Sequence, residues 1–335
     1  MTLIDLCERR LIPDPLTRLG MRRVIGHRWQ AEHGRDRRAV LRDLAEGPLA
    51  LATDDANDQH YELPPEFFVM CLGEHRKYSC GWWDENTPDL TASEARMLQI
   101  TCERAGIEDG MDILELGCGW GSLTLWMAEH YPNARITAVS NSAPQRRTIE
   151  QRLADRGCGN AQILTADMND FSIDQRFDRV VSVEMFEHMH NYAELLRRVR
   201  SWLKDDGRLF VHIFCHREFV YPFLDESNED WMARYFFTGG LMPSYDIFTH
   251  FPDDLQQLQS WWVPGGHYEK TSNAWLKKMD AHQERGMTIL QEHYGDDAAL
   301  WWQRWRMFYM AVAELFGYRN GEEWGVGHYL LGPAR

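Results

Sequence analysis

Short apolar runs and amphipathic runs alternate along the middle of the chain. The apolar runs have the length of buried strands, and the amphipathic runs carry apolar residues at helical spacing. The predicted strands are residues 112–116, 134–140, 161–165, 177–183 and 208–214, and the predicted helices are residues 121–130, 143–156 and 192–203. This alternation predicts an α/β fold in which helices cover both faces of a parallel sheet.

The pattern changes after residue 215. Residues 216–250 are aromatic and irregular, and regular patterns then return. They predict a sixth strand at 255–263, helices at 273–294 and 297–316, and a closing strand at 324–331. The predicted sheet therefore has seven strands and a helical, aromatic lid insertion after strand five, where substrate pockets of α/β proteins usually lie.

Helical patterns also precede this core. Residues 1–50 are predicted to form helices, and the Asp- and Asn-rich residues 52–60 to form a loop. The spacing of Thr91 and Glu94 predicts a capping box, and Gly106 is the expected end of that helix. We expect three parts, namely an N-terminal helical arm, a cofactor-binding core, and a lid with the last strands, at residues 1–75, 76–215 and 216–335.

Composition narrows the range of partners. The 335 residues carry a formal net charge of −15, which disfavours nucleic acid and anionic membranes and suits a neutral or cationic small molecule. Ten arginines between residues 9 and 42 are best explained as a solvated helix surface. Seven scattered cysteines without a CxxC pair argue against a zinc site or a disulfide framework. With no long apolar run and no signal peptide, we expect a cytoplasmic protein without integral membrane association, compatible with a homodimer.

A glycine-rich turn joins the first predicted strand to its helix. Gly117, Gly119 and Gly121 let backbone N–H groups approach a ligand, and the helix N-terminus adds positive charge. Glu115, at the strand end, can accept hydrogen bonds from a ligand amine or hydroxyl groups. A dinucleotide-binding turn would have the spacing G-x-G-x-x-G and an acid near the end of the second strand, where this chain has Ser140. The turn therefore favours S-adenosylmethionine.

Polar side chains follow the next two predicted strands. A ribose would lie near the end of the second strand. The base would lie near the end of the third, where a carboxylate can accept from an exocyclic amine and a methionine can lie against the ring. The candidates are Ser140, Asn141 and Gln145 for the ribose, and Asp167, Met168 and Asn169 for the base. Each is typical of a turn or cap by itself, but together at successive strand ends they favour a ligand.

Two carboxylates and a histidine follow the fourth predicted strand. Glu184 and Glu187 are three residues apart and should project in the same direction, and His188 adds a base whose pKa lies near neutrality. Such a cluster can bind an ammonium group, orient an amine and accept its proton. The two acids could instead only stabilise a helix N-terminus. Their place beside a cofactor turn favours a functional role.

The remaining candidates are less specific. Trp305 and Phe308 share a helix face, which is typical of a helix core but also of a wall for an aromatic or cationic substrate. His212, His216 and His267 are more typical of hydrogen-bonded core residues than of catalysts. No set of His, Cys and Asp has metal-ligand spacing, so no metal is expected.

Several motifs resemble those of a known family. They are LELGCGWG at 114–121, EMFEHM at 184–189, YFFTGG at 235–240, WLKKMD at 275–280 and GEEW at 321–324, with Tyr268 between them. The chain resembles the coclaurine N-methyltransferase-like members of the cyclopropane fatty acid synthase-like methyltransferases, over roughly residues 60–335. The resemblance implies a class I methyltransferase (Rossmann-like) fold, with S-adenosyl-L-methionine as methyl donor and S-adenosyl-L-homocysteine as product.

The resemblance also implies roles for individual residues. It places Tyr78 and Ser79 beside the cofactor, with the glycine turn and the strand-end residues already named. It makes Glu184, Glu187 and His188 the catalytic network. The expected substrate contacts are Phe237, Tyr268, Trp305 and Phe308.

The lipid-modifying branch of the same family is the main alternative. There, the positions of four residues bind bicarbonate, the catalytic base of that branch, and all four are kept here: Cys80, Glu187, His212 and Tyr268. That branch usually has glycine in place of Glu184 and a different residue in place of Phe214. A third alternative, an S-adenosylmethionine-binding protein without catalysis, would be expected to lose the motif at 184–188, which is complete.

These residues predict an S-adenosylmethionine-dependent N-methyltransferase that acts on a small aromatic or cyclic amine. The amine nitrogen would attack the methyl group in line, and the protein would mainly align donor and acceptor. Glu184 or Glu187 would anchor the amine. His188, helped by Glu187, would remove or relay its proton.

Overall fold

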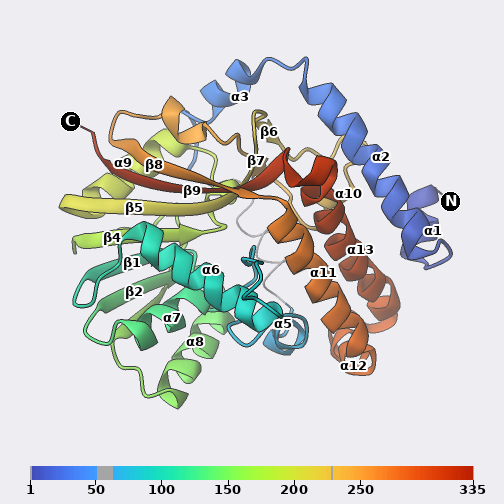
Figure 1. The fold of residues 1–335 in the computed structure, drawn as a ribbon, viewed down its shortest axis with the longest axis horizontal. Helices are drawn as coiled ribbons and strands as arrows, with labels where there is room; N and C mark the ends of the chain where they lie inside the picture. The colour runs from blue at the N-terminus through green and yellow to red at the C-terminus, as the bar shows by residue number, and fades with distance from the viewer. Residues whose placement is uncertain (1, 51–62, 228, 335) are drawn as a thin grey trace.

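A seven-stranded sheet organises the computed structural model, which describes residues 2–50, 63–227 and 229–334 (Figure 1). Its strands are β1 (Asp112–Leu116), β2 (Arg135–Ser140), β3 (Ala161–Thr165), β4 (Phe177–Val183), β5 (Leu203–His216), β8 (Leu255–Pro264) and β9 (Trp324–Pro333). Their order is β3-β2-β1-β4-β5-β9-β8; β1 to β5 are parallel, and β9 is antiparallel to both neighbours. The sheet has the predicted seven strands, and the predicted loop at 52–60 lies outside the described residues.

Helices cover both faces of this sheet. On one face lie α6 (Leu90–Ala105), α7 (Ser122–His130) and α8 (Ala143–Asp155), and on the other lies α9 (Tyr192–Trp202). Successive strand residues face opposite sides, so Ile113 of β1 packs in the first core and its neighbour Leu114 in the second. Burial on both faces explains why the strands read as continuous apolar runs.

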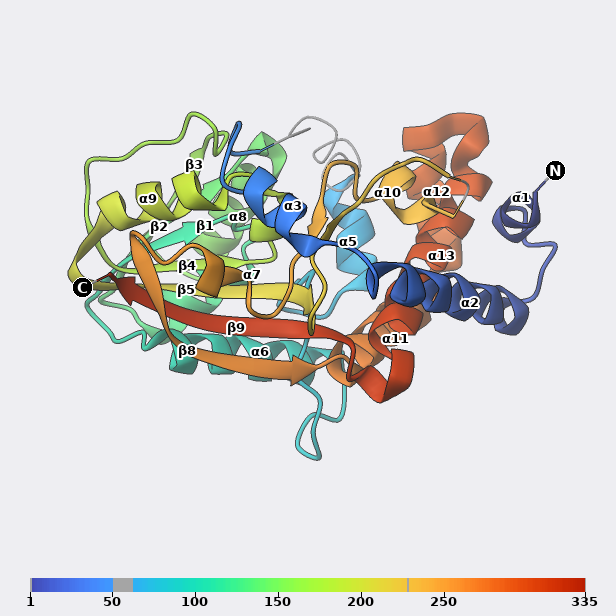
Figure 2. The same cartoon turned by 90° about the horizontal axis from the view of Figure 1, so that it is seen from above.

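A third, aromatic core lies beyond the carboxyl ends of the parallel strands. It is built from helices near both ends of the chain, which Figure 2 shows gathered on one side of the sheet. They are α1 (Leu3–Glu8), α2 (Asp14–Glu32), α5 (Pro65–Cys71), α10 (Trp231–Tyr235), α11 (Gly266–Ala281), α12 (Gln283–Tyr294) and α13 (Ala298–Phe316), while α3 (Arg37–Asp43) lies nearer the sheet. Trp275, Trp302 and Trp305 are completely or almost completely buried there. The predicted three-part division stays a prediction.

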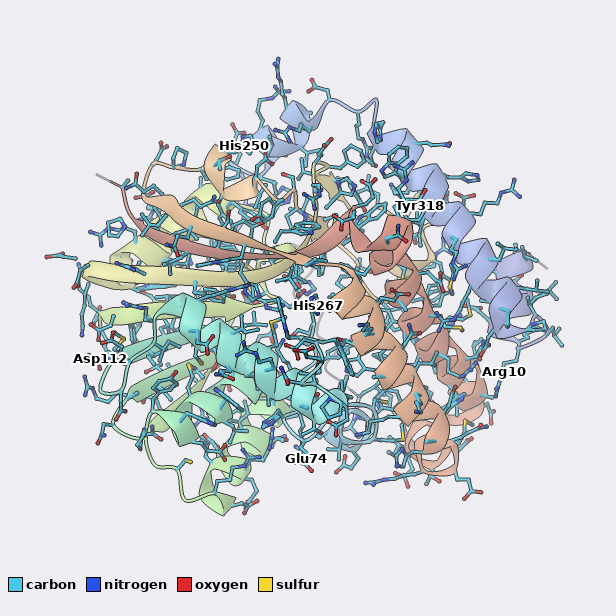
Figure 3. All side chains as sticks on the ribbon, in the orientation of Figure 1. Arg10, Glu74, Asp112, His250, His267 and Tyr318 are labelled. Carbon is cyan, nitrogen blue, oxygen red and sulfur yellow. The ribbon has the colours of Figure 1, made fainter. Side chains whose placement is uncertain are left out.

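Contacts between the aromatic segment around residue 80 and α11 join the sheet to this helical unit. His267 lies at the junction (Figure 3) and accepts a hydrogen bond from the Trp83 N–H at 2.9 Å. Its ring stacks on that of Trp82, with 4.3 Å between centroids. His267 is therefore a structural residue of this junction, as its sequence context indicated.

The predicted capping box at Thr91 is wrong. Helix α6 begins one residue after Asp89, whose side chain accepts from the Ala92 N–H at 2.9 Å. Glu94 is buried and accepts instead from the N–H groups of Gly73 and His75, at 2.8 and 3.0 Å. A long-range partner overrides the local pattern because burial of the carboxylate requires donors that the loop after α5 supplies.

Two other element boundaries differ from the prediction. The single helix expected at 273–294 is two helices, because the backbone at His282 is not helical (φ −116°, ψ 30°) and α12 turns to pack on α13. Strand β5 begins at Leu203, five residues earlier than predicted, because Leu203 pairs with Phe177. Gly207 lies within this strand, where a Cβ would come 2.8 Å from the Phe177 carbonyl oxygen.

Candidate active site

The glycine turn after β1 lines a small cavity of about 80 Å³. Gly117, Gly119 and Gly121 have φ angles of +75°, +51° and +77°, in the left-handed region that favours glycine. A Cβ on Gly117 would lie 2.8 Å from that of Met185. The cavity is lined by Gly117, Gly119, Val139, Ser140, Asn141, Gln145, Ala166, Asp167, Met168, Glu184, Met185, His188 and Met189.

Polar groups in this cavity fit a nucleoside-bearing cofactor. The Ser140 hydroxyl donates to Gln145 Oε1 at 2.7 Å, which leaves the buried Gln145 Nε2 without a hydrogen-bond partner among the described residues. An unpaired buried amide N–H is costly unless a ligand accepts from it. Asp167 and Met168 lie on the same wall, so the strand ends converge as the sequence predicted.

Four predicted cofactor residues do not line this cavity, and their roles stay predictions. Tyr78 lines a second, larger cavity. Ser79 is buried and accepts from the ammonium of Lys77 at 2.5 Å. The Asn169 side chain accepts from the Ala50 N–H at 3.1 Å.

The fourth, Glu115, is buried and accepts from the Thr124 hydroxyl at 2.5 Å. Burial raises the pKa of Glu115 to about 8. The sequence did not predict the apolar residues that line the cavity, because apolar residues next to strands give no binding signal. They are Val139, Ala166, Met185 and Met189.

Glu115→Gln should stabilise the protein, and more so as the pH rises from about 4.5 to 8. A carboxyl whose folded pKa is raised above its unfolded value favours folding below the unfolded pKa, and this advantage is lost as the pH rises through the folded pKa. The amide keeps the Thr124 hydrogen bond without this loss, so the gain should reach roughly 2–4 kcal/mol near pH 8. Urea unfolding of both proteins across this pH range measures it; a difference independent of pH would contradict the assignment.

The larger cavity, of about 180 Å³, lies between the sheet and the helical unit. Aromatic side chains dominate its walls, and Phe237, Tyr268 and Phe308 are among them as predicted substrate contacts. Trp305 is not. It lies behind the wall, with its ring centroid 5.7 Å from that of Phe308, which lines the cavity.

Glu184 and His188 line both cavities, and Glu187 lines the larger one. Glu184 has a φ of +50°, unusual for a residue with a side chain. The 3₁₀ turn Phe186–His188 follows directly and carries the other two groups. The three residues thus stand where the glycine-turn cavity meets the aromatic cavity.

Burial sets the protonation of this cluster. It raises the pKa of Glu184 to about 7, while a hydrogen bond from Glu187 and the charge of Lys77 act in the opposite direction. Burial, together with the adjacent Glu184 carboxyl, raises the pKa of Glu187 much further. Burial lowers the pKa of His188 to about 4. Near pH 7, Glu187 is therefore protonated, His188 is neutral, and Glu184 titrates.

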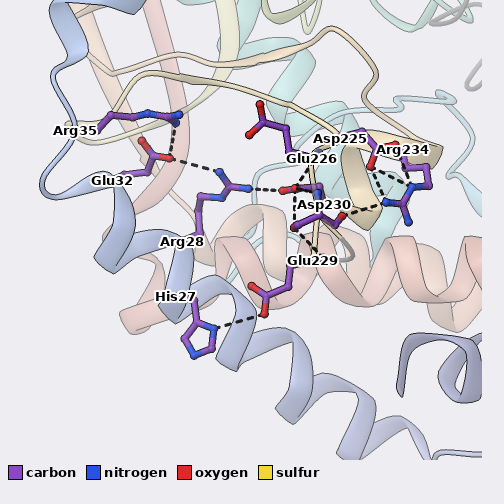
Figure 4. A network of polar contacts seen from close by, with 10 residues as sticks. His27, Arg28, Glu32, Arg35, Asp225, Glu226, Glu229, Asp230 and Arg234 are labelled. Atoms are coloured by element: carbon purple, nitrogen blue, oxygen red, sulfur yellow. Dashed lines mark hydrogen bonds and ion pairs between the residues drawn. The ribbon is translucent and has the colours of Figure 1, made fainter. Parts of the chain in front are cut away.

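The arginine-rich arm contributes to the outer wall of the larger cavity. Arg28 of α2 lines it and pairs with Asp230, which also lines it, at 2.7 Å (Figure 4). Arg18 pairs with Glu314 at 2.8 Å and Arg37 with Asp246 at 2.9 Å. These arginines bind the C-terminal half of the chain, so a purely solvated surface does not describe them.

Comparison with known proteins gives the family. The family model described as mycolic acid cyclopropane synthetase matches residues 52–321. The chain belongs to this family. Its relatives include (S)-coclaurine N-methyltransferase from Thalictrum flavum subsp. glaucum, 35% identical over 98% of this chain and 94% of that protein. The enzyme of the same name from Papaver somniferum is 34% identical over 97% of this chain and 95% of its own length.

Solved structures of the family agree. Coclaurine N-methyltransferase bound to N-methylheliamine and S-adenosylhomocysteine superposes with a TM-score of 0.93, at 33% identity, over 98% of both chains. The cyclopropane synthase MmaA2 from Mycobacterium tuberculosis, at 20% identity and a TM-score of 0.72 over 85% of this chain and 99% of its own, shows the fold alone. These comparisons confirm the predicted family and the class I methyltransferase fold. They also confirm that the chain is a methyltransferase and that S-adenosylmethionine is its cofactor.

The described residues show neither a candidate metal centre nor a helix suited to crossing a membrane. No group of three or more His, Cys, Asp or Glu side chains there could hold a metal ion. Of the helices in residues 2–50, 63–227 and 229–334, none is both long and apolar enough to cross a membrane.

Proposed function

We propose that this chain transfers a methyl group to the nitrogen of a small aromatic or cyclic amine held in the larger cavity. The observation that carries the proposal is that Glu184 and His188 line both cavities, so that a nitrogen bound beside them also faces the cofactor cavity. When bound in the smaller cavity, S-adenosylmethionine supplies the methyl group: the nitrogen lone pair forms the new C–N bond as the C–S bond breaks, which leaves S-adenosylhomocysteine.

The cluster suits the protonation changes of an amine. An amine that arrives as an ammonium ion must lose a proton before its lone pair can react, and Glu184, with a pKa of about 7, can accept that proton near neutral pH. Neutral His188 offers a second acceptor on the same wall. Protonated Glu187 donates to Glu184 and keeps its carboxylate oriented. Aromatic rings such as Phe237, stacked on His188 with centroids 5.9 Å apart, favour a cationic or aromatic substrate.

The alternative of lipid modification with bicarbonate is less well supported. The resemblance assigns bicarbonate to Cys80, Glu187, His212 and Tyr268. The His212 Nε2 atom, however, lies 3.2 Å from Glu184 Oε1. A second anion beside that carboxylate would be repelled, because like charges in a buried site disfavour one another strongly. In the proposed reaction, the Glu184 carboxylate takes the place of an external base.

A screen of amines with isotopically labelled methyl donor, read by product mass, tests the proposal. We expect methylated products from aromatic or cyclic secondary and primary amines, at a rate that added bicarbonate leaves unchanged. Unsaturated phospholipid vesicles serve as the second substrate panel. Bicarbonate-dependent mass gain on the lipids, without any amine product, would overturn the proposal in favour of the alternative.

Phe237→Ala should raise KM for the amine while leaving the affinity for S-adenosylhomocysteine unchanged. Loss of a ring face beside a cation costs about 0.5–2 kcal/mol, which corresponds to a rise of about 2- to 30-fold in KM. Trp305→Phe is the matched control, because Trp305 lies behind the wall. It should lower thermal stability and leave KM unchanged. Steady-state kinetics decide, and equal KM values for both variants would remove Phe237 from the substrate site.

A further inference from the structure

A chain of polar side chains runs from Glu184 across β5 and β9 to helix α6. His212 of β5 lies beside Glu184, and the paired residue of β9, His328, places its Nε2 atom 2.8 Å from His212 Nδ1. Arg104, at the end of α6, places a guanidinium nitrogen 2.8 Å from His328 Nδ1. Both histidines are completely buried. Arg104 is partly buried and is held over the rings of Trp82 and Trp261 at 5.9 and 5.1 Å.

The chemistry of arginine determines which atom donates and which accepts at each hydrogen bond of this series. A guanidinium group has five N–H donors and no acceptor, so His328 Nδ1 must accept from Arg104. Burial and the nearby charges of Lys77 and Arg104 lower the pKa of both histidines, which are therefore neutral. A neutral imidazole that accepts at Nδ1 carries its proton at Nε2. His328 must then donate to His212 Nδ1, and His212 must in turn direct its own Nε2 proton at Glu184.

The end of the chain meets a matching acceptor. Neither His212 Nε2 nor Glu184 Oε1 has a hydrogen-bond partner among the described residues, although the two atoms lie 3.2 Å apart. A buried donor and a buried acceptor this close are natural partners for one another, because an unpaired buried polar atom is costly. Arg104 cannot take up a further proton, so the chain cannot conduct a proton outward. It can only fix which atoms donate.

We propose that Arg104 is a positioning residue for methyl transfer, which acts through His328 and His212 to hold Glu184 as the proton-accepting carboxylate of the site. The inference rests on the proposed function, since it explains why Glu184 rather than Glu187 carries the negative charge. Arg104 itself lines neither cavity. Other ionisable groups also interact electrostatically with Glu184, and the effect of Arg104 is additional to theirs. They are Glu187 on the 3₁₀ turn, Lys77 and Cys80 before α6, Cys215 on β5 and Tyr268 on α11.

Nitrogen NMR of the full-length protein with ¹⁵N-labelled histidines tests which ring nitrogens carry the protons. This measurement needs no turnover. Ring nitrogens with and without a proton have distinct shifts, and His212→Gln and His328→Gln assign the two residues. In the wild-type protein at neutral pH, both rings should be neutral and protonated at Nε2. Arg104→Met should convert His328 to a mixture of tautomers. Arg104→Lys should keep the wild-type form, because lysine also only donates. A wild-type Nδ1–H tautomer at either ring would overturn the proposal.

The pH dependence of kcat/KM tests the consequence for catalysis. A carboxylate that loses a donor becomes a stronger base, so Arg104→Met should move the acid limb to higher pH by about 0.5–1 unit, and Arg104→Lys should restore it. Arg96→Met is the matched control on the same helix, because Arg96 pairs with Glu103 and not with the chain. An unmoved limb in Arg104→Met with altered tautomers would overturn the positioning role. If no amine is methylated, the proposed function fails. The NMR result still decides which nitrogens of His212 and His328 carry the protons.

Discussion

Glu184→Gln should lower kcat for amine methylation by about 10²- to 10⁴-fold, the range attributed to general acid–base catalysis. The amide keeps the shape of the side chain and can still accept from His212, but it cannot take a proton. Because the pKa of Glu184 is about 7, the wild-type rate should fall as the pH drops through 7, where protonation removes the acceptor. This acid limb should be missing in the variant. Rapid-quench single-turnover kinetics across pH 5.5–9, roughly two units around that pKa, measure both effects.

Glu187→Gln is the matched control for this prediction. Glu187 is already protonated near neutral pH, since burial and the adjacent carboxyl raise its pKa. An amide can replace it as a donor to Glu184, so the loss in kcat should be about tenfold or less, whereas Glu187→Ala should lose more. The affinity for S-adenosylhomocysteine, measured by calorimetry, should stay near the wild-type value in all three variants. Equal losses for both amide variants would show that the two acids are not differentiated as we propose.

Gly117→Ala should weaken the binding of S-adenosylhomocysteine by about 10- to 100-fold. The new methyl group would lie 2.8 Å from the Cβ of Met185, on the segment that lines the cofactor cavity and carries Glu184. Overpacking of this kind costs about 1–3 kcal/mol, and each 1.4 kcal/mol is about tenfold in affinity. The methyl transfer rate at saturating cofactor should fall as well, because Met185 cannot shift away from the new methyl group without moving its neighbour Glu184.

Gly157→Ala separates the contact from backbone strain. Its φ of +68° is close to the +75° of Gly117, but a Cβ there meets nothing within 4 Å and the residue lines neither cavity. Both variants should lose about 1–2 kcal/mol of unfolding free energy through left-handed strain. Only Gly117→Ala should lose cofactor affinity. Calorimetry and denaturant unfolding of the two proteins measure this, and normal binding by Gly117→Ala would remove the turn from the cofactor site.

The sequence by itself determined the fold class and which strand-end residues line one cavity. The strands have a continuous apolar pattern because both faces of the sheet are buried, and Gly117, Gly119 and Gly121 mark a turn that only glycine adopts easily. Carboxyl ends of parallel strands meet at one edge, so Ser140 and Met168 could be placed together without coordinates. The acids at 184 and 187 were found for the same reason.

Only the tertiary structure decided what the charged groups do. Glu94 was expected to cap its own helix, yet it binds N–H groups of a distant loop. Arg104 and His328 carry no local signal, because they are 224 residues apart and meet only where α6 packs against β9. Local patterns record which residues are buried in an element. Hydrogen-bond direction and pKa depend instead on which distant groups share a buried space, where an unpaired charge or donor is costly.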